Sequence, residues 1–301
     1  MKTFKFGQLL AKEDVCNRQE EIKLLRGICR AGGRAVVYGS RRFGKTSLVK
    51  NVVVRDFLKA EKKSLAVYAD LFQLDSLEDA SLRLRVALEH ALGERAKVKS
   101  FISALHTYIK HFRIEITADP LSGAPQVSLS GTPGARNDKT IHEIFVALKA
   151  LSGDYKTLLV LDEFQDICDV GGLEASLRSE IQTLTDTAVI VLGSKRHMLQ
   201  AIFHDESRPF YGFGVDVVIK SIDRKHWLPY MRERLAPAKL SIDQDGADAI
   251  CAQMRDVPNS IQELCQWIVL NRERERLTPD AVTKHMVDLI ENKSSRYFEK
   301  V

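Results

Sequence analysis

Short apolar runs alternate with segments of helical periodicity along the first two thirds of the chain. Apolar runs typical of buried strands occur at 34–38, 65–70, 158–161, 188–192 and 215–219. Between these runs, apolar residues recur at the three- and four-residue spacing of a helix. Strands that alternate with helices predict an α/β domain with a mostly parallel sheet.

The periodic segments predict helices around these strands. Asn17, with Glu20 three residues later, predicts the N-terminal cap of the first helix. Further helices are expected from Thr46 onward, over 76–110 with a break near Gly93, over 139–151 and over Lys195–Phe203.

One segment has the strand period instead. Alternation of apolar and polar positions over 112–131, with a turn in the middle, predicts an inserted β-hairpin. The hairpin either packs on the helical layer or contacts DNA or a partner protein. Both alternatives stay open at the level of the sequence.

The pattern changes after about Ile222, where only helical spacing remains. Apolar residues keep this spacing from Ile250 to Ile290, and Thr278-Pro279 has the cap and first-turn proline of a helix start. The sequence therefore predicts an α/β domain at 1–222 and a small all-helical domain at 223–301.

Composition adds limits to this organisation. The chain has 301 residues, and its 45% hydrophobic and 28% charged content is ordinary for a soluble globular protein. A net charge of +5 permits contact with DNA without indicating it. The five scattered cysteines form no CxxC pair, and no run suits a signal peptide or membrane span, which favours a cytoplasmic protein with reduced thiols.

A phosphate-binding loop pattern lies between the first apolar run and the following helix. Glycines at 39 and 44 are expected to take positive φ and to expose backbone N–H groups to phosphate. In this pattern Lys45 reaches the β and γ phosphates, and the Thr46 hydroxyl ligates magnesium. The expected nucleotide-binding residues are Gly39, Ser40, Arg41, Arg42, Phe43, Gly44, Lys45, Thr46 and Ser47. The alternative is a glycine turn with surface basic residues.

Two adjacent carboxylates follow the apolar run at 158–161. Asp162 is expected to hold magnesium together with Thr46, and Glu163 to act as the general base that activates water. The alternative is an acidic turn that caps the next helix. Paired carboxylates at a buried strand end repel each other unless a cation compensates their charge. The phosphate loop also needs a partner for its magnesium ion, which favours the first interpretation.

Ser194 follows the run at 188–192, whose strand is expected between the strand of the phosphate loop and that of Asp162. Its hydroxyl either senses the γ phosphate or the attacking water, or caps the helix that begins at Lys195.

These motifs together resemble the archaeal-type ATPases of the STAND/AAA+ group of P-loop NTPases. The resemblance covers nearly the whole chain. The matching segments, in order, are Asn17-Arg18 with Glu21 and Leu25, Gly39–Thr46, Asp162–Gln165, Gly193-Ser194 with Met198 and Phe203, Pro209–Gly212, and Val257-Pro258 with Ile261 and Gln262.

The chain departs from this family at two positions. Phe213 stands where relatives often carry an arginine, which leaves Arg208 as the nearby candidate for a contact with a neighbouring subunit's γ phosphate. Asn259 and Ser260 follow Pro258, where many AAA+ proteins have an arginine. Relatives often continue into a further domain, so the resemblance also implies an effector protein in trans.

The resemblance implies an Mg²⁺-dependent ATPase with ATP as its nucleotide. The expected protein is a homo-oligomeric motor or switch that acts on DNA or on a partner protein, with Lys45, Glu163, Ser194 and Arg208 as catalytic residues. The alternative is a low-turnover nucleotide switch that controls a separate effector. A small-molecule kinase is disfavoured because it leaves Glu163 and the helical domain unexplained.

Overall fold

The computed structural model describes residues 3–96, 105, 107–109, 112–119, 124–130, 137–271 and 275–298. The chain forms two compact units. The first comprises Met1–Ile22, Ser40–Val52 and Ile219–Val301, and the second comprises Lys23–Gly39 and Val53–Val218. The domain boundary at 222 and 223 stays a prediction.

A five-stranded parallel sheet forms the centre of the second unit. Its strand order is β2-β5-β6-β1-β7, so the expected position of the 188–192 strand, between the strand of the phosphate loop and that of Asp162, is confirmed. The α/β fold class is confirmed as well. The strands are β1 (Arg34–Tyr38), β2 (Ser64–Asp70), β5 (Lys156–Asp162), β6 (Thr187–Gly193) and β7 (Val215–Val218).

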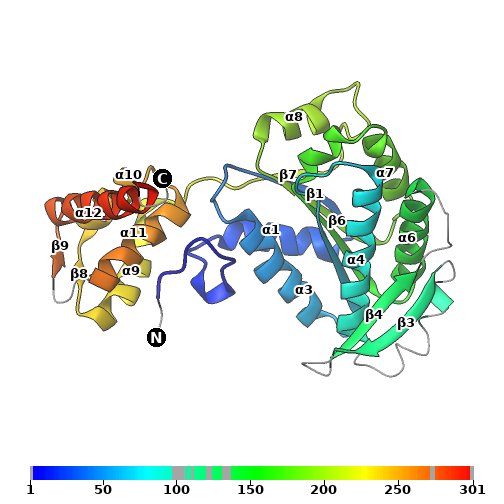
Figure 1. The fold of residues 1–301 in the computed structure, drawn as a ribbon, viewed down its shortest axis with the longest axis horizontal. Coiled ribbons are helices and arrows are strands. Elements are labelled where there is room, and N and C mark those ends of the chain that lie inside the picture. Colours follow the sequence, from blue (N-terminus) through cyan, green and yellow to red (C-terminus); the bar gives the residue numbers. More distant parts are fainter. Residues whose placement is uncertain are drawn as a thin grey trace. The chain divides into compact units, whose positions relative to one another are not determined.

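Helices cover both faces of this sheet (Figure 1). The chain passes from β1 to the edge strand β2 along one face, and it returns through β5 and β6 to β7 along the other, as right-handed crossovers require. The first face carries α1 (Gln19–Arg30) and α3 (Arg55–Ala60). The second carries α4 (Leu77–Arg95), α6 (Asn137–Ser152) and α7 (Leu173–Gln182), and α8 (Arg196–His204) follows β6.

The predicted hairpin is present as the antiparallel strands β3 (Arg113–Ala118) and β4 (Pro125–Ser130). Val127 and Leu129 are buried in the same core as α4, and the backbone N–H of Leu129 donates to Glu89 Oε1 at 2.7 Å. This contact supports packing on the helical layer. The expected turn after Asp119 and the segment from Gly131 lie mostly outside the described residues.

The first unit has a separate helical core, to which the N-terminal arm contributes Phe4 and Cys16. Its helices are α9 (Trp227–Leu235), α10 (Gln244–Gln253), α11 (Pro258–Asn271) and α12 (Pro279–Phe298). The expected cap of α12 is present, because Thr278 Oγ1 accepts a hydrogen bond from the backbone N–H of Ala281 at 3.3 Å. The expected all-helical domain also contains two short parallel strands, β8 (Ser241–Ile242) and β9 (Arg276–Leu277). A strand of two residues is too short to show a period in the sequence.

Three expectations about helices need correction. The first helix starts at Gln19, and Asn17 has a left-handed φ of 58° rather than the extended backbone of a cap. The helix after the phosphate loop is not regular, because α2 (Lys45–Leu48) continues as a π-helical stretch (Val49–Val54) before α3. Helix α4 ends at Arg95, and much of its expected continuation lies outside the described residues.

Five short 3-10 and π stretches complete the secondary structure of the described chain. Besides the π turn, they are η1 (Lys12–Asp14), η3 (Phe164–Asp169), η4 (Arg224–His226) and η5 (Ala236–Ala238). None of the helices in the described part of the chain has both the length and the apolar character that a membrane span needs.

Candidate functional site

The phosphate loop joins the end of β1 to α2, and its backbone has the conformation that exposes N–H groups. Gly44 has a φ of 85° and lies at the N-cap of α2. The second positive φ in the loop, 66°, belongs to Arg42 rather than to Gly39 as expected. A Cβ atom added at Gly44 would meet no heavy atom within 4 Å, so the conformation, and not crowding, favours glycine there.

The loop side chains differ in their surroundings. Lys45 is buried, and its Nζ donates to the carbonyl oxygen of Ser40 at 3.0 Å. Arg41 and Arg42 are exposed. Ser47 is buried and accepts a hydrogen bond from the backbone N–H of Leu10 at 3.0 Å, so its hydroxyl holds the N-terminal arm.

The start of α11 contacts the same loop within the first unit. The backbone N–H of Asn259 donates to the carbonyl oxygen of Arg42 at 3.4 Å. The Asn259 side chain accepts a hydrogen bond from the backbone N–H of Gly7 at 2.8 Å. Asn259 therefore links the helical part, the phosphate loop and the N-terminal arm, at the position where the sequence lacks the family's arginine.

At the carboxyl end of β5, both oxygens of the buried Asp162 carboxylate are engaged. Oδ1 accepts from the backbone N–H of Glu163 at 2.8 Å, and Oδ2 accepts from the Tyr68 hydroxyl on the neighbouring strand β2. Tyr68 was not identified from the sequence. The position of Tyr68 near Asp162 follows from the parallel pairing of β2 with β5, and the sequence alone does not give this pairing.

The Glu163 carboxylate receives two hydrogen bonds from side chains. Its Oε2 accepts from the Ser194 hydroxyl at 3.0 Å and from Gln165 Nε2 at 2.7 Å. Ser194 does not cap α8, because the N-cap residue is Lys195 and no side chain caps that end. The Ser194 hydroxyl therefore points to the candidate base. Glu163 itself has a φ of 49°, a left-handed conformation that is strained for a residue with a side chain.

Gln165 is the central residue of this network and was missed as a site residue. It is fully buried, and its Nε2 also donates to Asp166 Oδ1 at 3.0 Å. Its Oε1 accepts from the backbone N–H of Ser194 at 3.3 Å. A Cβ atom at Gly193 would lie 2.1 Å from Gln165 Oε1, so any larger residue at the tip of β6 would displace the Gln165 side chain.

Asp166 extends the network to the start of α8. Lys195 Nζ and the backbone N–H of Gln73 donate to its carboxylate at 3.0 and 2.8 Å. Burial alone would raise the pKa of Asp166, but the hydrogen bonds from Gln73, Lys195 and Gln165 outweigh it and lower the pKa below its usual value. Asp166 is therefore ionised at neutral pH.

Solved structures share this fold at low sequence identity. The Walker-type ATPase PABY2304 of Pyrococcus abyssi matches with a TM-score of 0.66 and 16% identity, over 99% of this chain and 78% of that one. The Aeropyrum pernix ORC1 protein, solved in complex with DNA, matches at 0.58 and 14%, over 95% and 69%. The Aeropyrum pernix ORC2 protein, solved in ADPNP-ADP complexes, matches at 0.56 and 14%, over 90% and 68%. The chain has the AAA+ P-loop ATPase fold.

These relations are distant. No family model matches the sequence, and no curated protein matches it. The AAA+ assignment therefore describes the fold, with the five-stranded sheet and the helical part that follows it.

Arg208, the expected contact to a neighbouring AAA+ subunit, is bound within its own chain. Its Nε donates to Glu174 Oε1 at 3.1 Å and its Nη2 to Glu174 Oε2. The hydrogen bond to Glu174 raises the pKa of Arg208 above its usual value. Phe213, the position of the family's arginine, lies in a cluster of aromatic rings with Phe203 and Phe210.

The donor set fits a nucleotide with magnesium. Among the described residues, no three His, Cys, Asp or Glu side chains gather as a metal site of their own. Mg²⁺ in proteins is commonly held by one or two carboxylates together with phosphate oxygens. In the first unit, the buried Lys45 and the left-handed Gly44 are suited to phosphate. In the second unit, the buried Asp162 is a carboxylate of the kind that holds Mg²⁺.

Proposed function

We propose that the protein is an Mg²⁺-dependent ATPase in which Glu163 is the general base. The observation that carries the proposal is the pair of hydrogen bonds from Ser194 and Gln165 to the Glu163 carboxylate. The strand order supports it, because β6, which ends beside Ser194, lies between β5 and the strand that leads into the phosphate loop.

In this proposal the phosphate loop binds the nucleotide. The N–H groups of 39–44 and the start of α2 face the phosphates, and Lys45 exchanges the Ser40 carbonyl for the β and γ phosphates. The exposed Arg41 and Arg42 add positive charge at the same end. Thr46 and Asp162 would hold the magnesium ion, which neutralises charge on the phosphate oxygens when it is bound.

The carboxylate of Glu163 accepts the proton of the attacking water. Ser194 and Gln165 both donate to Oε2 and so fix the orientation of the carboxylate, and Oε1 is the oxygen that accepts the proton. Ser194 and Gln165 position the base, and Ser194 in addition contacts the water or the γ phosphate.

The wider function is proposed from the fold and the sequence. The protein acts as a cytoplasmic homo-oligomer, as a motor or switch on DNA or on a partner protein, with the STAND/AAA+ division into 1–222 and 223–301. For Arg208 to reach a neighbouring subunit's nucleotide, it must leave Glu174. DNA is included because a structure of similar fold, Aeropyrum pernix ORC1, is in complex with DNA.

A low-turnover switch that controls an effector is the second candidate. It is favoured by Arg208, which Glu174 of the same chain holds and which therefore does not reach a neighbouring subunit's phosphate. ATP would then be bound and retained until a partner changes these contacts.

Phosphate release from ATP separates the two candidates. We expect release to rise steeply with protein concentration and to fall about 10²- to 10⁴-fold in Glu163→Gln, the range for loss of a general base. Glu206→Gln, an exposed glutamate outside the site, is the matched control. Stimulation by added DNA would support DNA as the substrate. If wild type and Glu163→Gln bind ATP and neither releases phosphate at any concentration, the switch is favoured and the ATPase proposal fails.

A further inference from the structure

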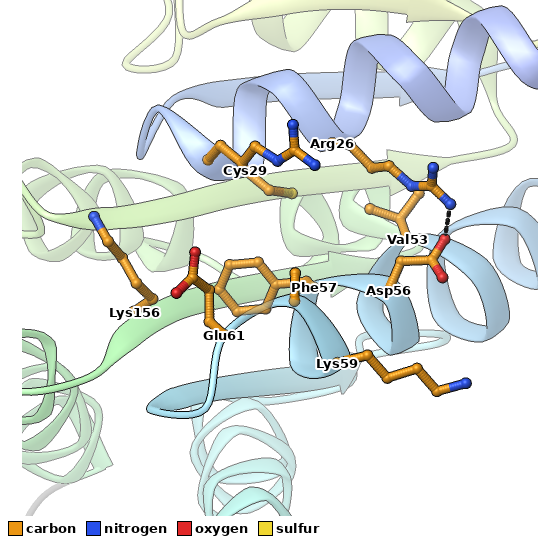
Figure 2. Close-up of a pocket in the computed structure, with 10 residues that line it drawn as sticks. Arg26, Cys29, Val53, Asp56, Phe57, Lys59, Glu61 and Lys156 are labelled. Carbon is orange, nitrogen blue, oxygen red and sulfur yellow. Dashed lines mark hydrogen bonds and ion pairs between the residues drawn. The ribbon is translucent and has the colours of Figure 1, made fainter.

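A cavity of about 310 Å³ lies in the second unit, between α1, α3 and the first residue of β5 (Figure 2). Lys156, at its edge, begins β5, whereas Asp162 ends that strand. The cavity therefore lies at the amino-terminal end of β5, whereas Glu163 and Ser194 follow the carboxyl-terminal ends of β5 and β6. None of the residues proposed to bind or hydrolyse nucleotide lines it.

One side of the cavity is apolar. Cys29, Val53 and Phe57 are buried and line it together with Ala60. Burial raises the pKa of the Cys29 thiol to about 12, so this side chain is neutral at physiological pH. Figure 2 shows the Phe57 ring across the cavity from Cys29 of α1. A flat apolar group would be matched by this surface.

The rim is mostly cationic. Arg26 and Arg30 lie one helical turn apart on α1 and line the cavity together, and Lys156 stands at the opposite end near Glu61. Arg26 pairs with Asp56 through Nη2, which neutralises one positive charge. Lys59 points away from the other side chains in Figure 2. The Glu61 carboxylate beside Lys156 offsets the charge of that lysine, so the exposed Arg30 supplies the remaining positive charge.

One donor at this rim is buried without an acceptor. Arg26 Nε has no hydrogen-bond partner among the described residues, although almost no solvent reaches it. Buried donors in folded proteins are nearly always paired, and an unpaired one is unfavourable. An oxygen atom bound beside Arg26 and Arg30 would provide the missing acceptor, and an anionic oxygen would suit both guanidinium groups.

We propose that this cavity binds a small aromatic anion, a flat ring system that carries one carboxylate or phosphate group. The ring packs on Phe57 and Val53, and the anionic group meets Arg26 and Arg30. A neutral aromatic molecule without an acceptor oxygen leaves Arg26 Nε unpaired, and a bare anion leaves the apolar side uncovered. The cavity therefore selects a ligand that has both an aromatic ring and an anionic group.

Calorimetric titration of the full chain with three probes tests this inference. The probes are 1-naphthoate, the neutral 1-naphthalenemethanol with the same ring, and acetate with the same charge. We expect 1-naphthoate to bind about tenfold more tightly than the alcohol, the factor that one charge-assisted hydrogen bond supplies. It should also bind more tightly than acetate, which has no ring to cover the apolar side. Equal affinity for the neutral and charged naphthalenes, or no binding of 1-naphthoate at millimolar concentration, would overturn the proposal.

Charge-reversal variants locate the binding. Arg30→Glu should weaken 1-naphthoate binding about tenfold or more, and Lys156→Glu by a smaller factor, since Lys156 lies at the far end. Both residues are exposed, so the fold should tolerate the changes. Arg55→Glu, an exposed residue of α3 outside the cavity, is the control and should stay within twofold. The proposal is also wrong if Arg55→Glu weakens binding as much as Arg30→Glu does.

Discussion

The phosphate loop and the acidic end of β5 achieve their geometry in different ways. The loop depends on its backbone: left-handed conformations at Arg42 and Gly44, and a bond from Lys45 to a carbonyl of the same loop. The end of β5 depends on side chains from several segments. These are Tyr68 on β2, Gln165 and Asp166 in η3, and Ser194 and Lys195 after β6.

This difference explains how each region responds to substitution. The phosphate loop needs particular φ values and one charged side chain, and most of its other side chains are free to vary. A side-chain network loses its geometry when any central member is removed, because the remaining donors and acceptors are buried and left unpaired. We therefore expect the loop to control nucleotide binding, and the network at β5 to control the rate after binding.

Removing the charge from the loop tests the first half of this comparison. Lys45→Ala should lower ATP affinity about 10- to 100-fold, since a hydrogen bond to a charged group contributes about 1.5–3 kcal/mol. The measurement is the equilibrium titration of a fluorescent ATP analogue. Arg55→Ala, an exposed cation further along the same helical segment, should bind as the wild type does. Unchanged affinity in Lys45→Ala would mean that the loop does not hold the phosphates.

Removing the centre of the network tests the second half. Gln165→Leu should lower kcat for phosphate release about tenfold, because Glu163 loses one of its two side-chain donors. KM should change by less than about twofold, since Gln165 is not placed among the nucleotide ligands. A merely structural role would instead lower the amount of folded protein with kcat per folded molecule unchanged.

A second variant reaches Gln165 indirectly. Gly193→Ala places a methyl group 2.1 Å from Gln165 Oε1 and 2.7 Å from Leu199 Cδ1, so Gln165 must move. It should reproduce the loss of kcat in Gln165→Leu. Gln182→Leu, on the exposed end of α7, is the matched control for Gln165→Leu and should keep the wild-type kcat. If Gly193→Ala keeps the wild-type kcat, the position of Gln165 is not critical.

The same contrast explains what the sequence could predict. The loop is encoded in ten consecutive residues, so its strand, turn and helix start were predicted, with Arg42 in place of Gly39 as the one error in conformation. Of the strand order, the place of the 188–192 strand between β1 and β5 was predicted and is confirmed. Tyr68 and Gln165 were missed because their roles depend on neighbours from other segments, which no spacing along the chain displays.

Local competition accounts for the remaining differences. Asn17 is a residue type that often caps helices, but Asn17 and Arg18 enter α1 with left-handed φ values. Arg18 is buried and donates hydrogen bonds to Glu21 and to the carbonyl oxygen of Lys220. Ser194 is a good capping residue by type, yet its hydroxyl donates to Glu163. In both places a contact distant in sequence overrides a local preference.

The smallest expected effect concerns Asp166, whose side chain supports the network through Gln165 and Lys195 rather than by bonding to the Glu163 carboxylate. Its pKa is lower in the folded protein than its ordinary value, so the unfolded chain binds a proton more readily. Asp166 therefore stabilises the fold above about pH 4, the ordinary carboxylate value, and this contribution is lost as pH falls through the folded pKa. Asp166→Asn should cost about 1 kcal/mol at pH 7, the net contribution of a typical hydrogen bond, because the amide keeps part of the hydrogen bonding.

Urea unfolding at a series of pH values measures this contribution. The difference in unfolding free energy between wild type and Asp166→Asn should be constant from about pH 7 to pH 5 and should shrink towards pH 3. Asp186→Asn, an exposed aspartate in the loop before β6, should show little difference at any pH. A difference for Asp166→Asn that stays constant down to pH 3 would show that the side chain acts through its shape and neutral hydrogen bonds. The charged pair with Lys195 would then add nothing to the rigidity of the β5 end, and the contrast with the phosphate loop would rest on Gln165 and Ser194 alone.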